Sequence, residues 1–420
     1  MAYSAGLFFL LLSTCHGQLV NTLSRSPKIS AQKMNQSPSE YTNMRAEFIA
    51  GLNNEDVKLS IGELILKYGY PLEEHEVLTE DGYILTMFRI PGKGPVVLLM
   101  HGLFGSADDF VVAGPKNSLA YLLANDGYDV WLGNARGNKH SRRHVSLDPA
   151  GPAFWKFSWH EIGYYDLPAM IDYSLNMTNR RSLYYIGHSQ GTTTFFVMGS
   201  ERPEYNEKVI LMIALAPSAY LSYTNSQATQ ILARSGGLIK KVLNNNGIYE
   251  LLSDTPLIRI VKNILCDAGP VADILCNRIV MSLNIFSYTE LNATLLPVIF
   301  SHAPSGASIG QINHYLQGIV SGDFRQYDHG PDRNMKKYGR VTPPSYPLAK
   351  ISAPVALFFS DSDLVCSSRD VYKLRRKLSN CVDMYKIPNE YHFGHVDFIW
   401  AKHFRNVIYK RIIKLLKTHV

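Results

Sequence analysis

The chain has 420 residues, of which 46% are hydrophobic, and its formal net charge at pH 7 is +7. This length and composition can support one large core, or a core with a substantial insertion. The modest positive charge is spread along the chain, and the sequence has no zinc-finger spacing, phosphate loop or dinucleotide fingerprint. These observations argue against nucleic-acid binding and against a bound metal or cofactor.

The first residues read as a targeting segment. The apolar run Leu7–Leu12 is too short to span a bilayer and is followed mostly by small residues up to Gly17. We therefore predict a signal peptide over residues 1–18 and a mature protein that leaves the cell or enters an acidic vesicle. Residues 19–55 are rich in Ser, Asn, Lys and Gln, which predicts poor order. No other stretch is apolar and long enough for a transmembrane helix.

The middle of the chain alternates between strand and helix patterns. Alternating residues on both sides of Glu80-Asp81-Gly82 predict a hairpin, and later strands alternate with helices. This order is typical of an α/β protein with a mostly parallel sheet and helices on both faces. We predict a core over residues 56–218 and 350–420. Residues 219–349 separate two core strands by far more than a loop, and we interpret them as a helical cap.

Gly187-His188-Ser189-Gln190-Gly191 is the most informative motif. It follows the strand-like run Leu183–Ile186 and precedes a helix-like run that begins at Thr192. Gly-x-Ser-x-Gly between a strand and a helix forms a sharp turn that exposes a nucleophilic serine above the sheet. We therefore predict that Ser189 is the nucleophile.

A serine nucleophile needs a base and an acid, and both are expected later in the chain. Asp363 follows the strand-like run Pro354–Ser360 and is the preferred acid, with Asp361 as the alternative. His395 lies in the loop after the next strand pattern and is the preferred base, with His392 as its rival. His395 would take the serine proton, and Asp363 would orient the imidazole.

The negative oxygen formed during attack needs hydrogen-bond donors. One is the backbone N–H after the nucleophile, at Gln190. The second is expected in the loop after an early core strand. Val96–Met100 is such a strand and His101-Gly102-Leu103 follows it, so we assign the second donor to the Leu103 amide.

Taken in order, these motifs resemble the acid lipase family, which includes gastric and lysosomal acid lipases and insect digestive members. The resemblance extends from about Tyr68 to the C-terminus. Its further motifs are Tyr68–Pro71, Glu80–Leu85, Gly133–Asn138, Tyr165–Pro168 and Phe393–Phe398. The family usually has glycines where this chain has Ser360 and Asp361, so the choice between Asp361 and Asp363 stays open here.

The resemblance implies an α/β-hydrolase fold and a secreted serine lipase. Its substrate would be a neutral lipid at an interface, either a triacylglycerol or a sterol ester, cleaved through an acyl-enzyme on Ser189. The protein would act extracellularly or in a gut lumen, or alternatively in lysosomes. A non-catalytic lipid-binding protein and a small-ester hydrolase remain as other interpretations of the same fold.

Four cysteines remain beyond the predicted signal peptide. Cys266 and Cys276 are close in sequence, and the resemblance places a disulfide in this region. Cys366 and Cys381 either pair or stay free. Asn-x-Ser/Thr sequons at Asn35, Asn176 and Asn292 are candidate glycosylation sites, consistent with a secreted protein.

Overall fold

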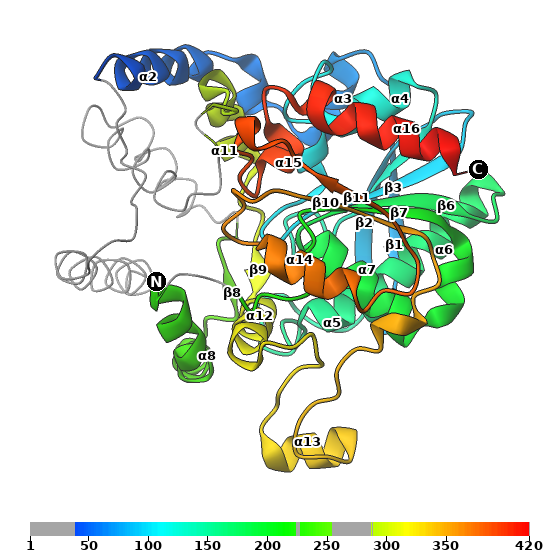
Figure 1. Ribbon diagram of the computed structural model, residues 1–420, viewed down its shortest axis with the longest axis vertical. Helices are drawn as coiled ribbons and strands as arrows, with labels where there is room; N and C mark the ends of the chain where they lie inside the picture. The colour runs from blue at the N-terminus through cyan, green and yellow to red at the C-terminus, as the bar shows by residue number, and fades with distance from the viewer. Residues whose placement is uncertain (1–37, 224–226, 254–286, 288, 420) are drawn as a thin grey trace.

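The computed structural model describes residues 38–223, 227–253, 287 and 289–419 (Figure 1). In this part of the chain nine strands form one sheet in the order β1-β2-β4-β3-β6-β7-β10-β11, with β5 beside β2. Neighbouring strands from β4 to β11 are parallel, whereas β2 pairs antiparallel with β1, β4 and β5. The predicted mostly parallel sheet is confirmed. The strands are β1 (Glu73–Leu78), β2 (Tyr83–Ile90), β3 (Val96–Met100), β4 (Asp129–Leu132), β5 (Arg143–His144), β6 (Leu183–His188), β7 (Val209–Leu215), β10 (Val355–Phe359) and β11 (Cys381–Lys386).

The antiparallel end of the sheet is the predicted hairpin. Strands β1 and β2 pair from Glu73 opposite Arg89 to Leu78 opposite Ile84. The turn between them contains Gly82 at φ 93°, a backbone conformation that glycine adopts without steric cost. The alternating sequence pattern and the Asp-Gly turn therefore identify this element correctly.

The parallel strands are buried on both faces, which explains why they are apolar along their whole length. All five residues of β3 are buried. Val97 and Leu99 belong to one hydrophobic cluster, whereas Leu98 and Met100 belong to another. Because successive side chains of a strand point to opposite faces, the sheet separates two apolar layers.

Helices cover both layers (Figure 1). In this view α3, α4 and α16 lie above the sheet and supply residues to the cluster that contains Val97 and Leu99. Below the sheet lie α5, α6, α7 and α14, which supply residues to the cluster that contains Leu98 and Met100. The helices are α2 (Pro38–Leu52), α3 (Ile61–Lys67), α4 (Leu119–Asn125), α5 (Trp159–Glu161), α6 (Leu167–Thr178), α7 (Gln190–Glu201), α8 (Gln227–Asn245), α11 (Leu296–His302), α12 (Ile309–Ser321), α13 (Pro331–Tyr338), α14 (Ser368–Arg375), α15 (Asp397–Trp400) and α16 (Lys410–Thr418).

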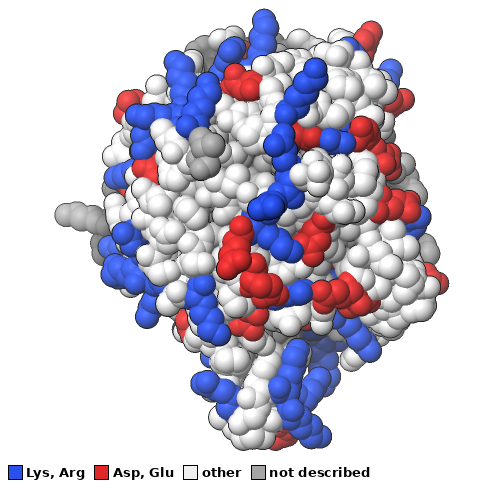
Figure 2. Space-filling view, turned by 90° about the vertical axis from the view of Figure 1, so that its right-hand side faces the viewer, with Lys and Arg blue, Asp and Glu red and all other residues white. Residues whose placement is uncertain are grey.

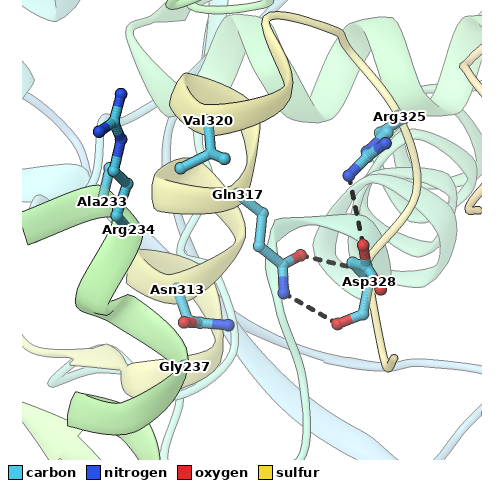
Figure 3. Close-up of a pocket in the computed structure, with 8 residues that line it drawn as sticks. All are labelled: Ala233, Arg234, Gly237, Asn313, Gln317, Val320, Arg325 and Asp328. Carbon is cyan, nitrogen blue, oxygen red and sulfur yellow. Dashed lines mark hydrogen bonds and ion pairs between the residues drawn. The ribbon is translucent and has the colours of Figure 1, made fainter. Parts of the chain in front are cut away.

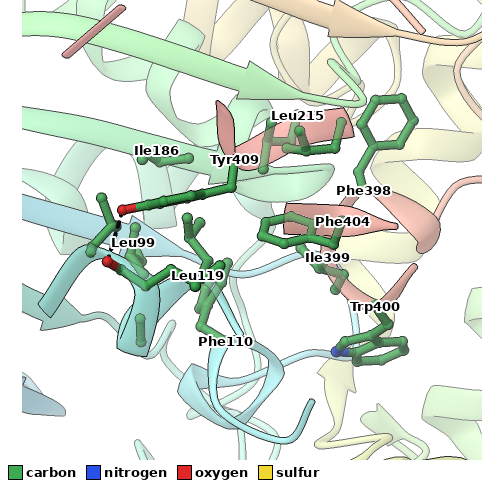
Figure 4. Packing of buried hydrophobic residues seen from close by; sticks show 14 of the residues in the cluster. Leu99, Phe110, Leu119, Ile186, Leu215, Phe398, Ile399, Trp400, Phe404 and Tyr409 are labelled. Carbon is green, nitrogen blue, oxygen red and sulfur yellow. Dashed lines mark hydrogen bonds between the residues drawn. The ribbon is translucent and has the colours of Figure 1, made fainter. Parts of the chain in front are cut away.

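The C-terminal segment closes the upper layer. Figure 4 shows Tyr409 packed near Leu99 and Ile186, which come from strands far away in the sequence, and Phe404 beside Ile399. The Tyr409 hydroxyl also donates to the Leu122 carbonyl at 2.7 Å. In α16 Ile412, Leu415 and Leu416 are buried and the lysines are exposed. This last helix packs its apolar face on the core, as helical spacing predicts.

The segment before the core differs from its prediction. Residues 38–52 form helix α2, although composition predicts poor order from residue 19 to residue 55. Phe48 of this helix is buried in the upper hydrophobic cluster, and a Cβ at Gly51 would lie 2.3 Å from the Thr294 carbonyl oxygen. These contacts are made with a segment more than 200 residues away, so local composition does not reveal them. Residues 19–37 lie outside the described residues.

Between β7 and β10 the chain leaves the main sheet. The described part of this stretch contains α8, α11, α12 and α13 and a small sheet of β8 (Glu250–Leu251) with β9 (Ala307–Ser308). Helix α13 projects away from the body of the molecule (Figure 1), and Figure 2 shows Lys and Arg gathered on this projection at the bottom of the view. No described helix is apolar and long enough to cross a membrane.

Candidate active site

Ser189 sits at the turn between β6 and α7. Its backbone is strained, with φ 50° and ψ −115°, and its N–H donates to the Leu215 carbonyl at 2.9 Å. A Cβ at Gly187 would lie 2.7 Å from the Gly191 carbonyl carbon, and one at Gly191 would lie 2.2 Å from the Met100 carbonyl oxygen. Both glycines are therefore needed for the close packing that holds the serine in this conformation.

Ser189, His395 and Asp363 come together from three separate loops. His395 Nε2 lies 2.7 Å from Ser189 Oγ, and His395 Nδ1 lies 2.9 Å from Asp363 Oδ2. The second carboxylate oxygen of Asp363 accepts from the N–H groups of Val365 at 2.8 Å and Cys366 at 3.0 Å. This arrangement fixes the carboxylate toward the imidazole and the imidazole toward the serine.

The two alternatives from the sequence lie elsewhere. Asp361 is 44% exposed, pairs with Lys386 and accepts from Ser368 Oγ at 2.6 Å. His392 is exposed in a left-handed conformation at the end of a short helical turn. The structure therefore brings Asp363 and His395, rather than these two neighbours, to Ser189.

The environment of His395 favours a protonated imidazole. Burial alone lowers the pKa of His395, but the Asp363 carboxylate outweighs it and holds the pKa well above its usual value. An imidazole that accepts a proton from Ser189 would therefore be stabilised as the imidazolium by Asp363.

His188 is a supporting residue that the sequence analysis leaves without a role. Its Nε2–H donates to the His395 carbonyl at 2.9 Å. Burial, followed by the nearby charge of His395, lowers the pKa of His188 to about 3, so its ring stays neutral. His188 thus ties the serine turn to the histidine loop, and its place beside Ser189 is the only sequence signal for this contact.

The loop after β3 approaches Ser189 closely. A Cβ at Gly102 would lie 3.1 Å from Ser189 Cβ, which brings the adjacent Leu103 to the serine turn. Gln190 is the first residue of α7, so its N–H is not used by the helix itself. Gly102, the residue before Leu103, therefore lies against the serine turn and Gln190 directly follows Ser189; the donor roles of the Leu103 and Gln190 amides stay a prediction.

The shape of this loop depends on buried hydrogen bonds from residues 134–138. His101 Nδ1–H donates to the Gly102 carbonyl at 2.8 Å, and its Nε2 accepts from the Ala135 N–H at 3.1 Å. Asn134 Oδ1 accepts from the Ala107 N–H at 3.0 Å. His101 is therefore a structural residue, and the Gly133–Asn138 motif supports the Leu103 loop.

A second buried group, which we call the Asp108 cluster, joins this loop to α11. Its members are Asp108, Lys139, His140 and His302. The Asp108 carboxylate contacts one nitrogen of each of the other three at 2.6 Å. Burial raises the pKa of Asp108, but these partners outweigh it and lower the pKa well below the usual value. The residues are up to 194 positions apart, so sequence patterns do not predict the cluster.

Asp109, next to this cluster, should make stability depend on pH. Burial, with the neighbouring Asp108 charge, raises the pKa of Asp109 to about 8. Between an unfolded pKa of about 4 and this value, unfolding releases a proton, so the free energy of unfolding falls as pH rises, by up to about 1.4 kcal/mol per pH unit. Asp109→Asn should remove this dependence, which denaturant unfolding of both proteins at about pH 5 and about pH 7 would measure. Parallel pH dependences in the two proteins would contradict the assignment.

The predicted glycosylation sites and cysteines differ in their exposure and pairing. Asn176 is exposed in the last turn of α6, and Asn292 is half-buried, with its Oδ1 accepting from Thr294 Oγ1 at 2.7 Å. Cys366 and Cys381 are both free thiols, so they do not pair with each other. Asn35, Cys266 and Cys276 lie outside the described residues.

A pocket of about 310 Å³ lies between α8 and α12 (Figure 3). Arg234, Gln317, Arg325 and Asp328 give it a polar lining, and Asp328 bonds both Gln317 and Arg325. None of the residues around Ser189 lines it. This pocket is therefore distinct from the candidate active site, and its polarity does not suit an acyl chain.

Comparisons with known proteins agree with this geometry. Residues 61–114 match a partial α/β-hydrolase lipase region, and residues 95–245 match the α/β-hydrolase fold. A putative lipase structure from Sulfolobus solfataricus covers 83% of this chain and 99% of its own, at a TM-score of 0.55 and 13% identity, which indicates a shared fold.

Closer similarity is found among curated proteins. Lipase 1 of Drosophila melanogaster is 44% identical over 86% of this chain and 80% of its own. Gastric triacylglycerol lipase of Bos taurus is 38% identical over 86% of this chain and 92% of its own. Human lipase member K is 36% identical over 87% of this chain and 93% of its own length. Because such similarity extends over most of both proteins, the chain belongs to the acid lipase family of α/β-hydrolases and is a carboxylic ester hydrolase.

Proposed function

We propose that the enzyme is a secreted serine lipase that cleaves neutral lipid esters, either triacylglycerols or sterol esters, through an acyl-enzyme on Ser189. The observation that carries this proposal is the continuous contact from Ser189 Oγ to His395 Nε2 at 2.7 Å and from His395 Nδ1 to Asp363 at 2.9 Å. The lipase names of its relatives support the substrate class.

The proposed reaction has two steps. Ser189 Oγ attacks the ester carbonyl carbon while His395 Nε2 takes the hydroxyl proton, and His395 then protonates the leaving alcohol. In the second step a water loses its proton to His395 and attacks the acyl-enzyme, which releases the fatty acid and restores Ser189. Asp363 stays ionised and stabilises the imidazolium in both steps.

The negative oxygen of each tetrahedral intermediate accepts hydrogen bonds from the Leu103 and Gln190 amides. One such donor typically contributes about 3–4 kcal/mol to transition-state stabilisation. The close approach of Gly102 to Ser189, with 3.1 Å between a Cβ at Gly102 and Ser189 Cβ, supports this role for the neighbouring Leu103.

The proposal includes the organisation of the chain. Residues 56–218 and 350–420 form the catalytic core, and residues 219–349 form a cap that selects the lipid. Residues 1–18 direct the protein out of the cell or to lysosomes, Cys266 pairs with Cys276, and Asn35, Asn176 and Asn292 are the candidate glycan sites. The substrate is met at a lipid–water interface.

Fatty-acid release from an emulsified long-chain triacylglycerol tests this function. The purified protein should release fatty acid, and a parallel assay with a soluble short-chain ester should show whether the emulsion is preferred. Ser189→Ala provides the background for both substrates. Turnover of the soluble ester alone would instead identify a small-ester hydrolase, and turnover of neither would favour a non-catalytic lipid-binding protein.

A further inference from the structure

The thiol of Cys366 lies inside the candidate active site but has no part in the proposed reaction. Cys366 is 1% exposed and free. Its Sγ lies 2.9 Å from Ser218 Oγ and 3.4 Å from the Ala216 carbonyl oxygen. Ser218 Oγ in turn lies 3.5 Å from Ser189 Oγ. The thiol is therefore held within the same group of polar atoms as the nucleophile.

Three side chains at this point offer sulfur, nitrogen and oxygen to one small space. The residues are Asp363, Cys366 and His395, and all three are buried. Each offers one ligand atom, and these three atoms lie within 4.8 Å of one another. In zinc sites, metal–ligand bonds of about 2.0–2.3 Å place the ligand atoms of a tetrahedron roughly 3.3–3.7 Å apart. To surround an ion, each pair of ligand atoms would thus need to approach by at most about 1.1–1.5 Å.

The identity of the donors determines which cations fit. A thiolate with an imidazole favours borderline and soft metals such as Zn²⁺, Co²⁺ and Cd²⁺ over Mg²⁺ and Ca²⁺, which prefer oxygen ligands. We propose that Cys366, His395 and Asp363 form an inhibitory site for a soft divalent cation.

Occupation of this site would block the proposed reaction directly. The metal bonds to Cys366 Sγ, whose proton leaves to solvent, and to a nitrogen of His395. A metal on Nε2 takes the lone pair that faces Ser189, and a metal on Nδ1 moves the ring proton to Nε2, so in either case Nε2 cannot accept the Ser189 proton. Removal of the ion by a chelator restores the free site.

Cobalt provides a spectroscopic test that does not depend on turnover. Titration of the full protein with Co²⁺ should give a thiolate-to-cobalt charge-transfer band. Cys366→Ala should lose the part of this absorbance that develops with one bound Co²⁺ per protein. Cys381→Ala is the matched control, because Cys381 is the other free thiol in the described residues and lies on β11. Equal bands in wild type and Cys366→Ala, or no band in the wild type, would overturn the site.

Inhibition is the second readout, and it rests on the proposed esterase activity. Zn²⁺ should inhibit hydrolysis of a soluble ester reversibly, and each variant is compared with its own metal-free rate. Loss of an outer partner of a metal ligand typically costs 10–100-fold in affinity, so loss of the thiolate itself should raise the inhibition constant by at least about 100-fold. Cys381→Ala should retain the wild-type constant.

The two readouts separate the two proposals. A Cys366-dependent cobalt band without any ester turnover would contradict the proposed function and leave the metal site standing. Ester turnover whose Zn²⁺ inhibition is the same in wild type and Cys366→Ala would overturn the inhibitory site and leave the function standing.

Discussion

Ser189→Ala should lower kcat for ester hydrolysis by on the order of 10⁶, because loss of the nucleophile typically removes almost all of the rate enhancement that a serine triad provides. The backbone at Ser189 is strained at φ 50°, and alanine is the smallest side chain that keeps a Cβ there, so the fold should persist. Initial rates with a soluble ester, together with an unfolding curve for each protein, would measure both effects.

Ser218→Ala is the matched control for this substitution. Ser218 Oγ lies only 3.5 Å from Ser189 Oγ, but it has no hydrogen bond to His395. Its removal should change kcat by less than about tenfold, the size expected for a lost neutral hydrogen bond near the site. If Ser189→Ala and Ser218→Ala lost activity equally, the serine turn would not hold the nucleophile.

Asp363→Asn should lower kcat by about 10⁴ while the fold is retained. The N–H groups of Val365 and Cys366 donate to one oxygen of Asp363, so they would hold the amide oxygen of an asparagine at that position. The amide NH₂ would then face His395 Nδ1 and stabilise the tautomer that carries its proton on Nε2. That tautomer cannot accept the Ser189 proton.

The same change should also move the pH profile. The carboxylate raises the pKa of His395, so its removal should shift the acid limb of kcat/KM to lower pH. Asp361→Asn is the control, because Asp361 makes only an exposed ion pair and a hydrogen bond to Ser368. It should keep near-wild-type kinetics and change stability by less than about 1 kcal/mol. A larger loss in Asp361→Asn than in Asp363→Asn would reverse the assignment of the acid.

Local patterns in the sequence predict the sheet well because each strand carries its own signal. The predicted strand at Val96–Met100 coincides with β3, and the one at Pro354–Ser360 contains β10, since buried parallel strands must be apolar on both faces. The serine turn carries a local signal as well, because Gly187 is required by its close contact with Gly191 within the turn.

Features that depend on distant contacts are not visible in this way. The choice between Asp361 and Asp363 depends on which carboxylate faces an imidazole 32 residues later. The Asp108 cluster joins residues up to 194 positions apart, and α2 is stabilised by segments distant in the chain. A single sequence records such residues as ordinary loop or helix positions.

The junction between α11 and the Leu103 loop bears on how this enzyme could be recombined with its relatives. The Ser305 N–H donates to the Phe104 carbonyl at 2.7 Å, and the Ser305 carbonyl accepts from the Lys139 N–H at 2.9 Å. His302 contributes to the Asp108 cluster in the same place. An exchange of residues 219–349 between family members would therefore also replace His302 and Ser305, which contact the Leu103 loop and the Asp108 cluster. Chain-length selectivity and catalytic rate should not be separable by such grafts unless residues 103–108 and 139–140 are transferred with them.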